Sequence, residues 1–461
     1  MKIAIIGAGV AGCAAYLELR KHLPKPTTST DKDKEPEHDI KIYEAYSTEI
    51  DESPETRDGG SIHSTTLLVG GGLAIGSNGL GVLQRLDETL LREVTHEGHV
   101  ASHYNIRDKN GRVLIRVAPM EGENPSPLLI LGTTRHSLWK NLRSLIPSRD
   151  IIQTRVAEVI PHADGRNTVM FRDGRRPEEV DLVVGADGIW STTKRALFSD
   201  AEQSQHAVQF SGLVGVGGFV PAADVKDLVE PGSINFVFGD NGFFGYYYNT
   251  GAESDPHAGS PYHVSEPGDS LGWWSTYALE DCPDRASLDM EPVLKQLLER
   301  HGNWQDPVIQ RIIHTVKFKT IWPTWTTPPL PTWERDGVVL IGDAAHALPP
   351  SSGQGSSQAL EDSEAFALFL GHHLRKEGAL LSVKSQKEAI NAAARQFFAL
   401  RQPRLKEILS SSQALQNKKR NMSVFQKHLM YAFMSIRAGG ARKVHCYNIS
   451  EQVARILASE S

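Results

Sequence analysis

The sequence predicts an α/β fold in which a parallel sheet with helices around it carries an inserted β-sheet domain and a C-terminal helical region. Two glycine-rich turns support this prediction, because each follows a short apolar run of strand type and precedes a helical pattern. The first turn lies at the N-terminus and the second begins at Gly342. Between them, residues 207–279 contain segments of alternating or continuous apolar character, which indicate a separate sheet.

The composition is that of an ordinary globular protein. The chain has 461 residues, of which 40% are hydrophobic and 23% charged, and this length allows two or more domains. A net charge of -6 provides no basic field for nucleic acid or an anionic membrane. Three cysteines without a CxxC spacing suggest neither a disulfide framework nor a metal site. No run of residues is apolar enough to span a bilayer, and the interrupted N-terminal run fits a strand better than a signal peptide. We therefore expect a cytoplasmic protein.

The first glycine-rich turn has the spacing of a dinucleotide-binding fingerprint. Lys2 to Ile6 is expected to be a buried strand, and the segment after it opens a helix. The glycines permit a tight turn, close approach of a pyrophosphate to backbone N–H groups, and close packing of the helix on the strand. This pattern predicts a Rossmann-type domain. Its candidate cofactor-binding residues are Gly7, Gly9, Val10, Ala11 and Gly12.

An acidic residue follows the predicted second strand. Glu44 comes directly after Ile40 to Tyr43, where a carboxylate accepts hydrogen bonds from an adenosine ribose and repels a 2′-phosphate. This favours FAD or NAD over NADP in this half of the domain. The polar segment Pro24 to His38, expected to be a solvated loop, lengthens the usual spacing. An ordinary exposed glutamate is therefore the alternative.

The second glycine-rich turn is expected to form a cradle for a flavin. Asp343 ends an apolar strand and can accept hydrogen bonds from a polyol, while a helix is expected to begin near Gln354. Unpaired N–H groups at a helix N-terminus stabilise an anionic group or a ring that becomes anionic on reduction. Gly353 and Gly355 permit close approach, and Ser356 follows them as a further candidate residue.

Several motifs carry a resemblance to a known family. The segment GDAAHALPPSSGQGSSQALED resembles the second FAD motif of the class A flavoprotein monooxygenases, the p-hydroxybenzoate hydroxylase-like aromatic hydroxylases. The GADG segment, with Asp187 and Gly188, resembles the DG motif of that family, which contacts FAD and takes part in NAD(P)H use. Its Ser191 is expected to cap a helix that contains Lys194 and Arg195.

Two further segments match less distinctive parts of the family. Gly71 and Gly72 lie in a stretch that resembles the GAGI…PN segment, where the backbone passes the cofactor before a helix capped by Ser or Asn. Arg135 resembles an FAD-contacting arginine at a helix start, and a positive charge there favours an anionic partner. The alternatives are a flexible glycine turn and a surface arginine.

The resemblance implies an FAD-binding domain of the p-hydroxybenzoate hydroxylase fold. Residues 1–200 with 335–385 are expected to form that domain, residues 201–334 a substrate-binding β-sheet domain, and residues 386–461 the C-terminal helical region. It also implies the reaction: NADPH or NADH reduces the flavin, O2 adds to give a C4a-hydroperoxide, and its distal oxygen passes to an aromatic or other hydrophobic small molecule by hydroxylation or epoxidation. Long inserted loops suggest a substrate from secondary metabolism.

The inserted sheet is expected to supply the substrate pocket. Its aromatic residues alternate, so that one set faces inward over the flavin and favours a planar hydrophobic substrate, with core packing as the alternative. No residue is identified as catalytic, and His346 in the second motif is expected to be structural. Two other classes share these motifs, a flavin oxidoreductase that does not oxygenate and a non-enzymatic flavin-binding relative. The sequence does not predict the oligomeric state.

Overall fold

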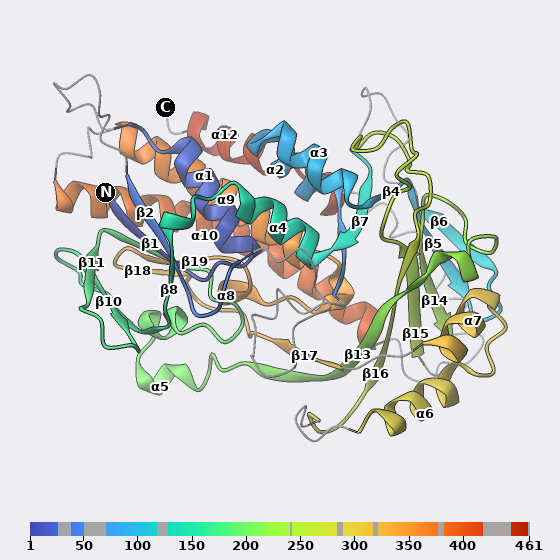
Figure 1. Cartoon of the computed structure of the whole chain (residues 1–461). Coiled ribbons are helices and arrows are strands. Elements are labelled where there is room, and N and C mark those ends of the chain that lie inside the picture. The colour runs from blue at the N-terminus through green and yellow to red at the C-terminus, as the bar shows by residue number, and fades with distance from the viewer. Residues whose placement is uncertain are drawn as a thin grey trace.

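The computed structural model describes residues 1–25, 38–49, 71–117, 128–239, 242–283, 289–316, 321–376, 382–417 and 444–459. Most of the loop expected at Pro24–His38 lies outside these residues. The described part forms two main sheets, each with its own hydrophobic core, and Figure 1 shows them at opposite sides of the molecule. None of the helices in these ranges is long and apolar enough to cross a membrane.

The first main sheet has six strands in the order β18-β19-β12-β1-β2-β8. All neighbouring pairs are parallel except β18 with β19. The central strands β1, β12 and β19 are nearly continuous buried apolar runs, as is usual for parallel strands with layers on either side. Their bounds are β1 Lys2–Ile6, β2 Asp39–Glu44, β8 Ile151–Gln153, β12 Leu182–Gly185, β18 Glu334–Arg335 and β19 Val338–Leu340.

Helix α9 (Gly355–Lys376) is the central helix of this part of the molecule. It packs against α1 (Val10–His22), α2 (Ser77–Leu86), α10 (Val383–Asn417) and α12 (Ile449–Ser459), and Figure 1 shows α1 and α9 together over the six-stranded sheet. Because helices surround it, α9 buries polar side chains as well as apolar ones. Those polar groups need partners inside the protein.

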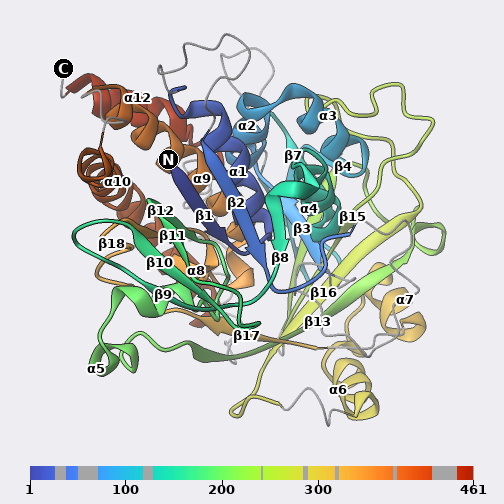
Figure 2. The same ribbon diagram turned by 60° about the vertical axis from the view of Figure 1, so that its left-hand side comes forward.

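Two smaller antiparallel sheets flank the parallel one. The first consists of β11 (Glu178–Val180), β10 (Asn167–Phe171) and β9 (Val156–Ile160), and the second of β3 (Gly72–Ile75), β7 (Ile130–Thr134) and β4 (His99–Ala101). The second small sheet lies between the two main sheets in Figure 2. The short helices near these sheets are α3 Glu88–His96, α4 Arg135–Ser144, α5 Asp200–Gln203 and α8 Asp343–His346.

The second main sheet has seven strands in the order β17-β13-β16-β15-β14-β5-β6. Helices α6 (Met290–His301) and α7 (Pro307–Thr315) pack on one face, and the other face is turned toward the six-stranded sheet (Figure 1). The strands are β5 His103–Asp108, β6 Val113–Val117, β13 Gln209–Pro221, β14 Ser233–Gly239, β15 Gly242–Tyr248, β16 Ser270–Ala278 and β17 Trp322–Thr326.

The structure confirms most expected elements and adds three strands to the inserted sheet. The strands expected between residues 207 and 279 are present, and Gly239 pairs with Gly242 across a hairpin whose residues 240 and 241 lie outside the described part. However, the sheet also contains β5 and β6, which precede residue 201. Trp322–Thr326 also belongs to it, because it pairs with β13 as an edge strand. The helix expected after Asp187 is present as a 3-10 helix, Thr193–Leu197, and the Ser191 hydroxyl accepts a 2.8 Å hydrogen bond from the amide of Lys194.

Candidate cofactor and substrate site

Four parallel strands bring the distant sequence motifs to one edge of the six-stranded sheet. The strands β2, β1, β12 and β19 are neighbours, and their carboxyl ends lead to Glu44, Gly7, Asp187 and Asp343 respectively. In an open α/β sheet this edge is where ligands bind. The assembly of these residues is therefore the candidate cofactor site.

The first turn is closely packed against the third motif. Gly7 has a φ of 100°, a left-handed conformation that favours glycine, and a Cβ atom there would lie 2.6 Å from the carbonyl oxygen of Ala186. A Cβ atom at Gly12 would lie 1.9 Å from the carbonyl oxygen of Gly7. These contacts explain two of the three glycines by packing. Gly9, Val10 and Ala11 are partly exposed at the N-terminus of α1.

Glu44 contacts the backbone of this turn. Its Oε2 accepts a hydrogen bond of 2.7 Å from the amide of Ala8, and its Oε1 accepts one of 3.0 Å from the amide of Tyr46. The side chain is only 9% exposed, and this burial raises the pKa of the Glu44 carboxyl above its ordinary value although the amide donors oppose the effect. Glu44 is thus held beside the N-terminus of α1, as a ribose-binding acid must be.

The start of α9 leaves open space above its N-terminus. Gly353 has a φ of 61°, and Cβ atoms built at Gly353 and Gly355 meet no atom within 4 Å. Both glycines and Asp343 are exposed, and Ser356 is half-buried. A helix N-terminus lined with exposed glycines suits an anionic or electron-rich ring, so these residues fit a bound flavin.

Arg135 and the strand before α2 lie together. The Arg135 amide donates a 3.1 Å hydrogen bond to the Gly71 carbonyl, and a Cβ atom at Gly71 would lie 3.3 Å from Cδ of the exposed Arg135 side chain. Thr134 caps α4 as expected, accepting from the Ser137 amide. Gly72 opens strand β3, so this part of the stretch is not the flexible glycine turn given as the alternative.

The cap expected for α2 is also different. Its N-cap is Gly76 rather than a serine or asparagine, and Asn78 lies inside the helix with its side chain only 2% exposed. The Ser77 hydroxyl donates instead to the carbonyl of Leu128, 2.7 Å away. Asn78 does not cap the helix, because its side-chain amide donates hydrogen bonds to Gln354 and Glu361 in the protein interior.

Asp187 binds the turn that follows it. Its carboxylate accepts hydrogen bonds from the hydroxyls of Ser191 and Thr193 and from the amides of Thr192 and Thr193, at 2.6 to 3.1 Å. Burial raises the pKa of the Asp187 carboxyl although these donors oppose it. The contacts of Asp187 therefore fix the shape of the loop after it. Gly188 has a φ of 75° and open space at its Cβ position, so its backbone, rather than the Asp187 side chain, is the part of this motif that borders the candidate site.

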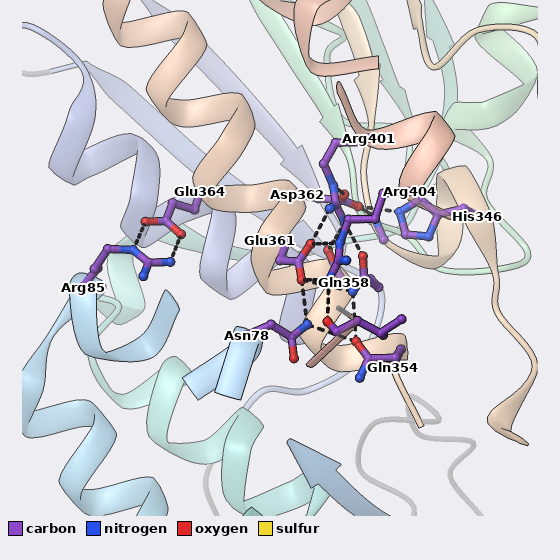
Figure 3. A network of polar contacts seen from close by, with 12 residues as sticks. Asn78, Arg85, His346, Gln354, Gln358, Glu361, Asp362, Glu364, Arg401 and Arg404 are labelled. Carbon is purple, nitrogen blue, oxygen red and sulfur yellow. Dashed lines mark hydrogen bonds and ion pairs between the residues drawn. The ribbon is translucent and has the colours of Figure 1, made fainter. Parts of the chain in front are cut away.

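A buried ionic network lies beneath the second motif (Figure 3). Arg401 of α10 is 0% exposed. It pairs with Glu361 and Asp362 of α9, and its Nε lies 2.8 Å from Oδ1 of Asp362. Arg404, one helical turn further on, binds both oxygens of Glu361 at 2.7 and 2.8 Å.

The same network holds the turn at Gly342. Oδ2 of Asp362 accepts a 2.9 Å hydrogen bond from the Gly342 amide and lies 2.5 Å from Nε2 of His346. Burial pushes the pKa of Asp362 upward, but His346 and Arg401 outweigh this effect and hold that pKa below its ordinary value. His346 also packs on Trp333, at 5.1 Å between ring centroids. These contacts support the structural role expected for it.

The aromatic residues of the large sheet divide between its two faces. Phe244, Tyr246, Tyr248 and Trp273 belong to the core beneath α6 and α7. On the opposite face, Trp274 lies over Gly245, where a Cβ atom would be 2.3 Å from its indole. Three aromatic rings surround Trp274 at 5.7 to 5.8 Å between centroids, namely Phe236, Phe243 and Tyr247.

This second face meets the cofactor-binding part of the molecule. The Tyr247 hydroxyl donates to the carbonyl of Thr133, two residues before Arg135, and would lie 2.2 Å from a Cβ atom at Gly72. Tyr104, Phe236 and Trp274 remain partly exposed. We refer to these three residues as the aromatic face. The alternation of aromatic residues predicted two distinct sets, and core packing accounts for one of them.

Several residues of the site were not singled out by the sequence. Arg401 and Arg404 come from α10, and His445 comes from the segment before α12. Nδ1 of His445 lies 3.2 Å from Nε2 of Gln354, the residue before α9. The sequence pattern that could have indicated the two arginines is their spacing of three residues, which places them on one side of a helix. That spacing does not show which residues of α9 they bind.

Comparisons with known proteins agree with this geometry. A family profile described as an FAD binding domain matches residues 152–397. Chloroplastic zeaxanthin epoxidase of Oryza sativa subsp. japonica is 28% identical over 307 residues, covering 65% of this chain and 42% of that protein. Salicylate hydroxylase of Pseudomonas putida is 26% identical over 217 residues, covering 46% of this chain and 47% of that protein. The matches thus span less than half of these relatives.

Solved structures share the whole architecture. HpxO of Klebsiella pneumoniae, in complex with FAD and uric acid, superposes with a TM-score of 0.68 at 18% sequence identity, covering 97% of each chain. At this identity the match shows the fold. The arrangement of parallel sheet, inserted sheet and C-terminal helices is therefore one that binds FAD in at least one solved protein.

Proposed function

This chain belongs to the FAD binding domain family, and from that premise we propose that it is an FAD-dependent monooxygenase. It would use NADPH or NADH and O2 to place one oxygen atom on an aromatic or other hydrophobic small molecule, while the second oxygen atom leaves as water. The observation that carries the proposal is that the start of α9 and the aromatic face meet at one residue, His445, whose Nδ1 lies 3.2 Å from Nε2 of Gln354 and whose ring centroid lies 5.7 Å from that of Tyr104. A flavin on that terminus and a flat substrate on that face would therefore be neighbours.

The residues of the chain would bind and orient the cofactor. Amides at the N-terminus of α1 would hold the pyrophosphate, with Gly7, Gly9, Val10, Ala11 and Gly12 as its binding segment. Glu44 would accept from the adenosine ribose and Asp343 from the ribityl chain. Gly71, Gly72, Arg135, Asp187 and Gly188 would border the flavin from the other side, with the Asp187 carboxylate acting through the loop that it shapes.

The environment of the reactive ring would come from α9. The bound flavin supplies the electron transfer and the activation of oxygen. Amides beside Gly353, Gly355 and Ser356 would stabilise negative charge on the ring, since they carry partial positive charge. Tyr104, Phe236 and Trp274 would exclude water from the opposite side. The described residues include no acid or base that the geometry assigns to catalysis.

The cellular setting is part of the proposal. Cys13, Cys282 and Cys446 form no disulfide, which fits a reducing compartment such as the cytoplasm. NADPH and NADH would bind only transiently, so we assign them no separate domain. We do not assign the substrates of the relatives named above to this chain. The substrate class that we propose rests on the aromatic face alone.

The proposal is tested by following the flavin absorbance. Purified protein is mixed anaerobically with NADPH and then with NADH, with and without a panel of aromatic and indolic compounds, and 18O2 is then admitted. We expect one compound to accelerate bleaching and to gain a single 18O atom. Bleaching without 18O in any product would indicate an oxidoreductase that does not oxygenate. A yellow protein that neither nucleotide reduces would indicate a flavin-binding protein without this activity.

A further inference from the structure

His445 occupies the space between the start of α9 and the aromatic face. Its ring centroid lies 5.7 Å from that of Tyr104, which in turn lies 5.7 Å from Phe236. Its Nδ1 would lie 2.5 Å from a Cβ atom at Gly76, and it is 3.2 Å from Nε2 of Gln354. One imidazole ring thus contacts both the helix that would hold the flavin and the face that would hold the substrate.

The hydrogen bonds of Gln354 fix which ring nitrogen carries the proton. Oε1 of Gln354 accepts from Nδ2 of Asn78 and from Nε2 of Gln358, both at 3.0 Å. The amide nitrogen of Gln354 therefore faces His445, and because it can only donate, Nδ1 of His445 must accept. A neutral imidazole that accepts at Nδ1 carries its proton on Nε2.

Buried charges set the orientation of those amides. Oε1 of Glu361 accepts from Asn78 at 2.6 Å and from Gln358 at 3.1 Å, while Nη2 of Arg401 donates to Oε1 of Gln358 at 2.6 Å. A carboxylate only accepts and a guanidinium only donates, so neither amide can turn over. The ion pairs of Figure 3 thus determine the tautomer of His445 through two layers of amides.

The protonation state of His445 agrees with this arrangement. Burial, together with the charge of Arg404, lowers the pKa of His445 to about 4 although Glu361 opposes the effect. The ring is therefore uncharged at neutral pH. Within the described ranges, the hydrogen bond of this ring to the protein is the one at Nδ1.

We infer that His445 donates its Nε2–H to an oxygen atom of the substrate, so that the site selects planar aromatic compounds bearing a hydroxyl or carbonyl group. The inference rests on the proposed function, because it takes the aromatic face as the substrate surface. His445 is then a substrate-binding residue, and Gln354 is a positioning residue that acts through it.

The tautomer can be measured directly on the full chain loaded with FAD. Long-range 1H–15N correlation spectra at pH 7 distinguish the two neutral tautomers and the charged ring, and the His445 signals are assigned by their loss in His445→Gln. We expect an unprotonated Nδ1 and a protonated Nε2. In Gln354→Leu the same signals should shift toward a mixture of tautomers. A protonated Nδ1 in the wild type would overturn the inference.

Binding of a matched pair of probes tests the donor. 2-Naphthol and naphthalene differ by one hydroxyl, and their affinities are measured from the perturbed flavin spectrum. We expect the wild type to prefer 2-naphthol by about tenfold, the range of one buried hydrogen bond. His445→Asn, which keeps only the contact toward Gln354, should lose the preference. His445→Gln, whose longer amide reaches the position of Nε2, should keep it.

The controls separate this inference from the proposed function. His314→Asn, on the exposed surface of α7, should bind both probes as the wild type does, and the FAD affinity of every variant is measured alongside. An unchanged preference in His445→Asn would overturn the inference even if the enzyme oxygenates its substrates. Failure of both nucleotides to reduce the flavin would overturn the proposed function but leaves the tautomer and the probe preference measurable.

Discussion

Arg401 and Asp362 form an ion pair that no solvent reaches, with Nε of Arg401 2.8 Å from Oδ1 of Asp362 and both side chains 0% exposed. The other oxygen of Asp362 binds the amide of Gly342, where the turn of the second motif begins. Helix α10 therefore stabilises the second motif through Asp362 of α9. A buried ion pair of this kind is costly to break, because the remaining charge has no partner.

Replacing Arg401 by methionine should destabilise the protein by about 3–5 kcal/mol, because Glu361 and Asp362 lose their shared cation. The free energy of unfolding, measured by urea denaturation, gives the size of the effect. Arg455→Met is the matched control, since Arg455 is 71% exposed and pairs with Glu451 of the same helix. That change should cost at most about 1 kcal/mol. Equal costs for the two variants would contradict the prediction.

Gly355→Val should leave the fold intact but prevent FAD binding. A Cβ atom at Gly355 meets nothing within 4 Å, so the added side chain enters the space that we assign to the flavin. We expect the thermal midpoint of the FAD-free protein to change little and the FAD affinity to fall by at least about 100-fold, or about 3 kcal/mol. Ser410→Val, on the exposed surface of α10, is the control. Normal FAD binding by Gly355→Val would place the flavin elsewhere.

Trp273 and Trp274 should respond differently to replacement by alanine although they are adjacent. Trp273 is 2% exposed and stacks on Phe244 at 5.4 Å in the core beneath α6 and α7, so its loss should cost about 3–5 kcal/mol. Trp274 is partly exposed on the aromatic face, so Trp274→Ala should cost less stability but abolish the binding of naphthalene. Denaturation and probe titration measure the two effects. Similar losses of stability would contradict this division of the sheet.

Two buried histidines should make the protein sensitive to weak acid. Burial lowers the pKa of His99 to about 4 and that of His301 to about 3, with the charge of Arg300 adding to the effect at His301. Below a pH of about 6.5 the unfolded chain binds protons at both residues while the folded protein does not, so stability falls with the pH. Each residue should contribute about 1.4 kcal/mol per pH unit, down to its folded-state pKa.

The contribution of His301 is isolated by difference. The free energies of unfolding of the wild type and of His301→Gln are compared between pH 7 and 4.5. In this range Glu361 and Asp362 stay charged. Despite their burial, His346, Arg401 and Arg404 hold the pKa values of these two carboxyls below the ordinary ones. The variant should lose less stability on acidification. Parallel curves would show that His301 becomes protonated in the folded protein.

The motifs of the cofactor site could be predicted from the sequence because each depends on short-range geometry. The turn at Gly7, the strand end at Glu44 and the helix start near Gln354 all follow from glycine spacing and apolar runs within a few residues. The partners of Glu361 and Asp362 could not be predicted in this way. They come from an arginine about 40 residues further along the chain, and a charged residue in a helix usually indicates a solvated surface.

The position of His445 was equally inaccessible to sequence reasoning. Its contacts join the C-terminal segment to β5, through Tyr104, and to the residue before α9. No periodicity relates these three segments. The sequence also did not predict that β5 and β6 belong to the large sheet. Strand β14 pairs with β5 in parallel across more than 100 residues of intervening chain, and no local pattern indicates such a pairing.

The dependence of α9 on α10 has a consequence for the synthesis of this protein in the cell. Glu361 and Asp362 leave the ribosome before Arg401, so a nascent chain that ends between them would bury both carboxylates without the arginine that they share. The parallel sheet also remains without β19 until residue 340 has emerged. We therefore expect the flavin to be acquired late in translation or after release, and nascent chains stalled before Arg401 to be targets for chaperones and proteases.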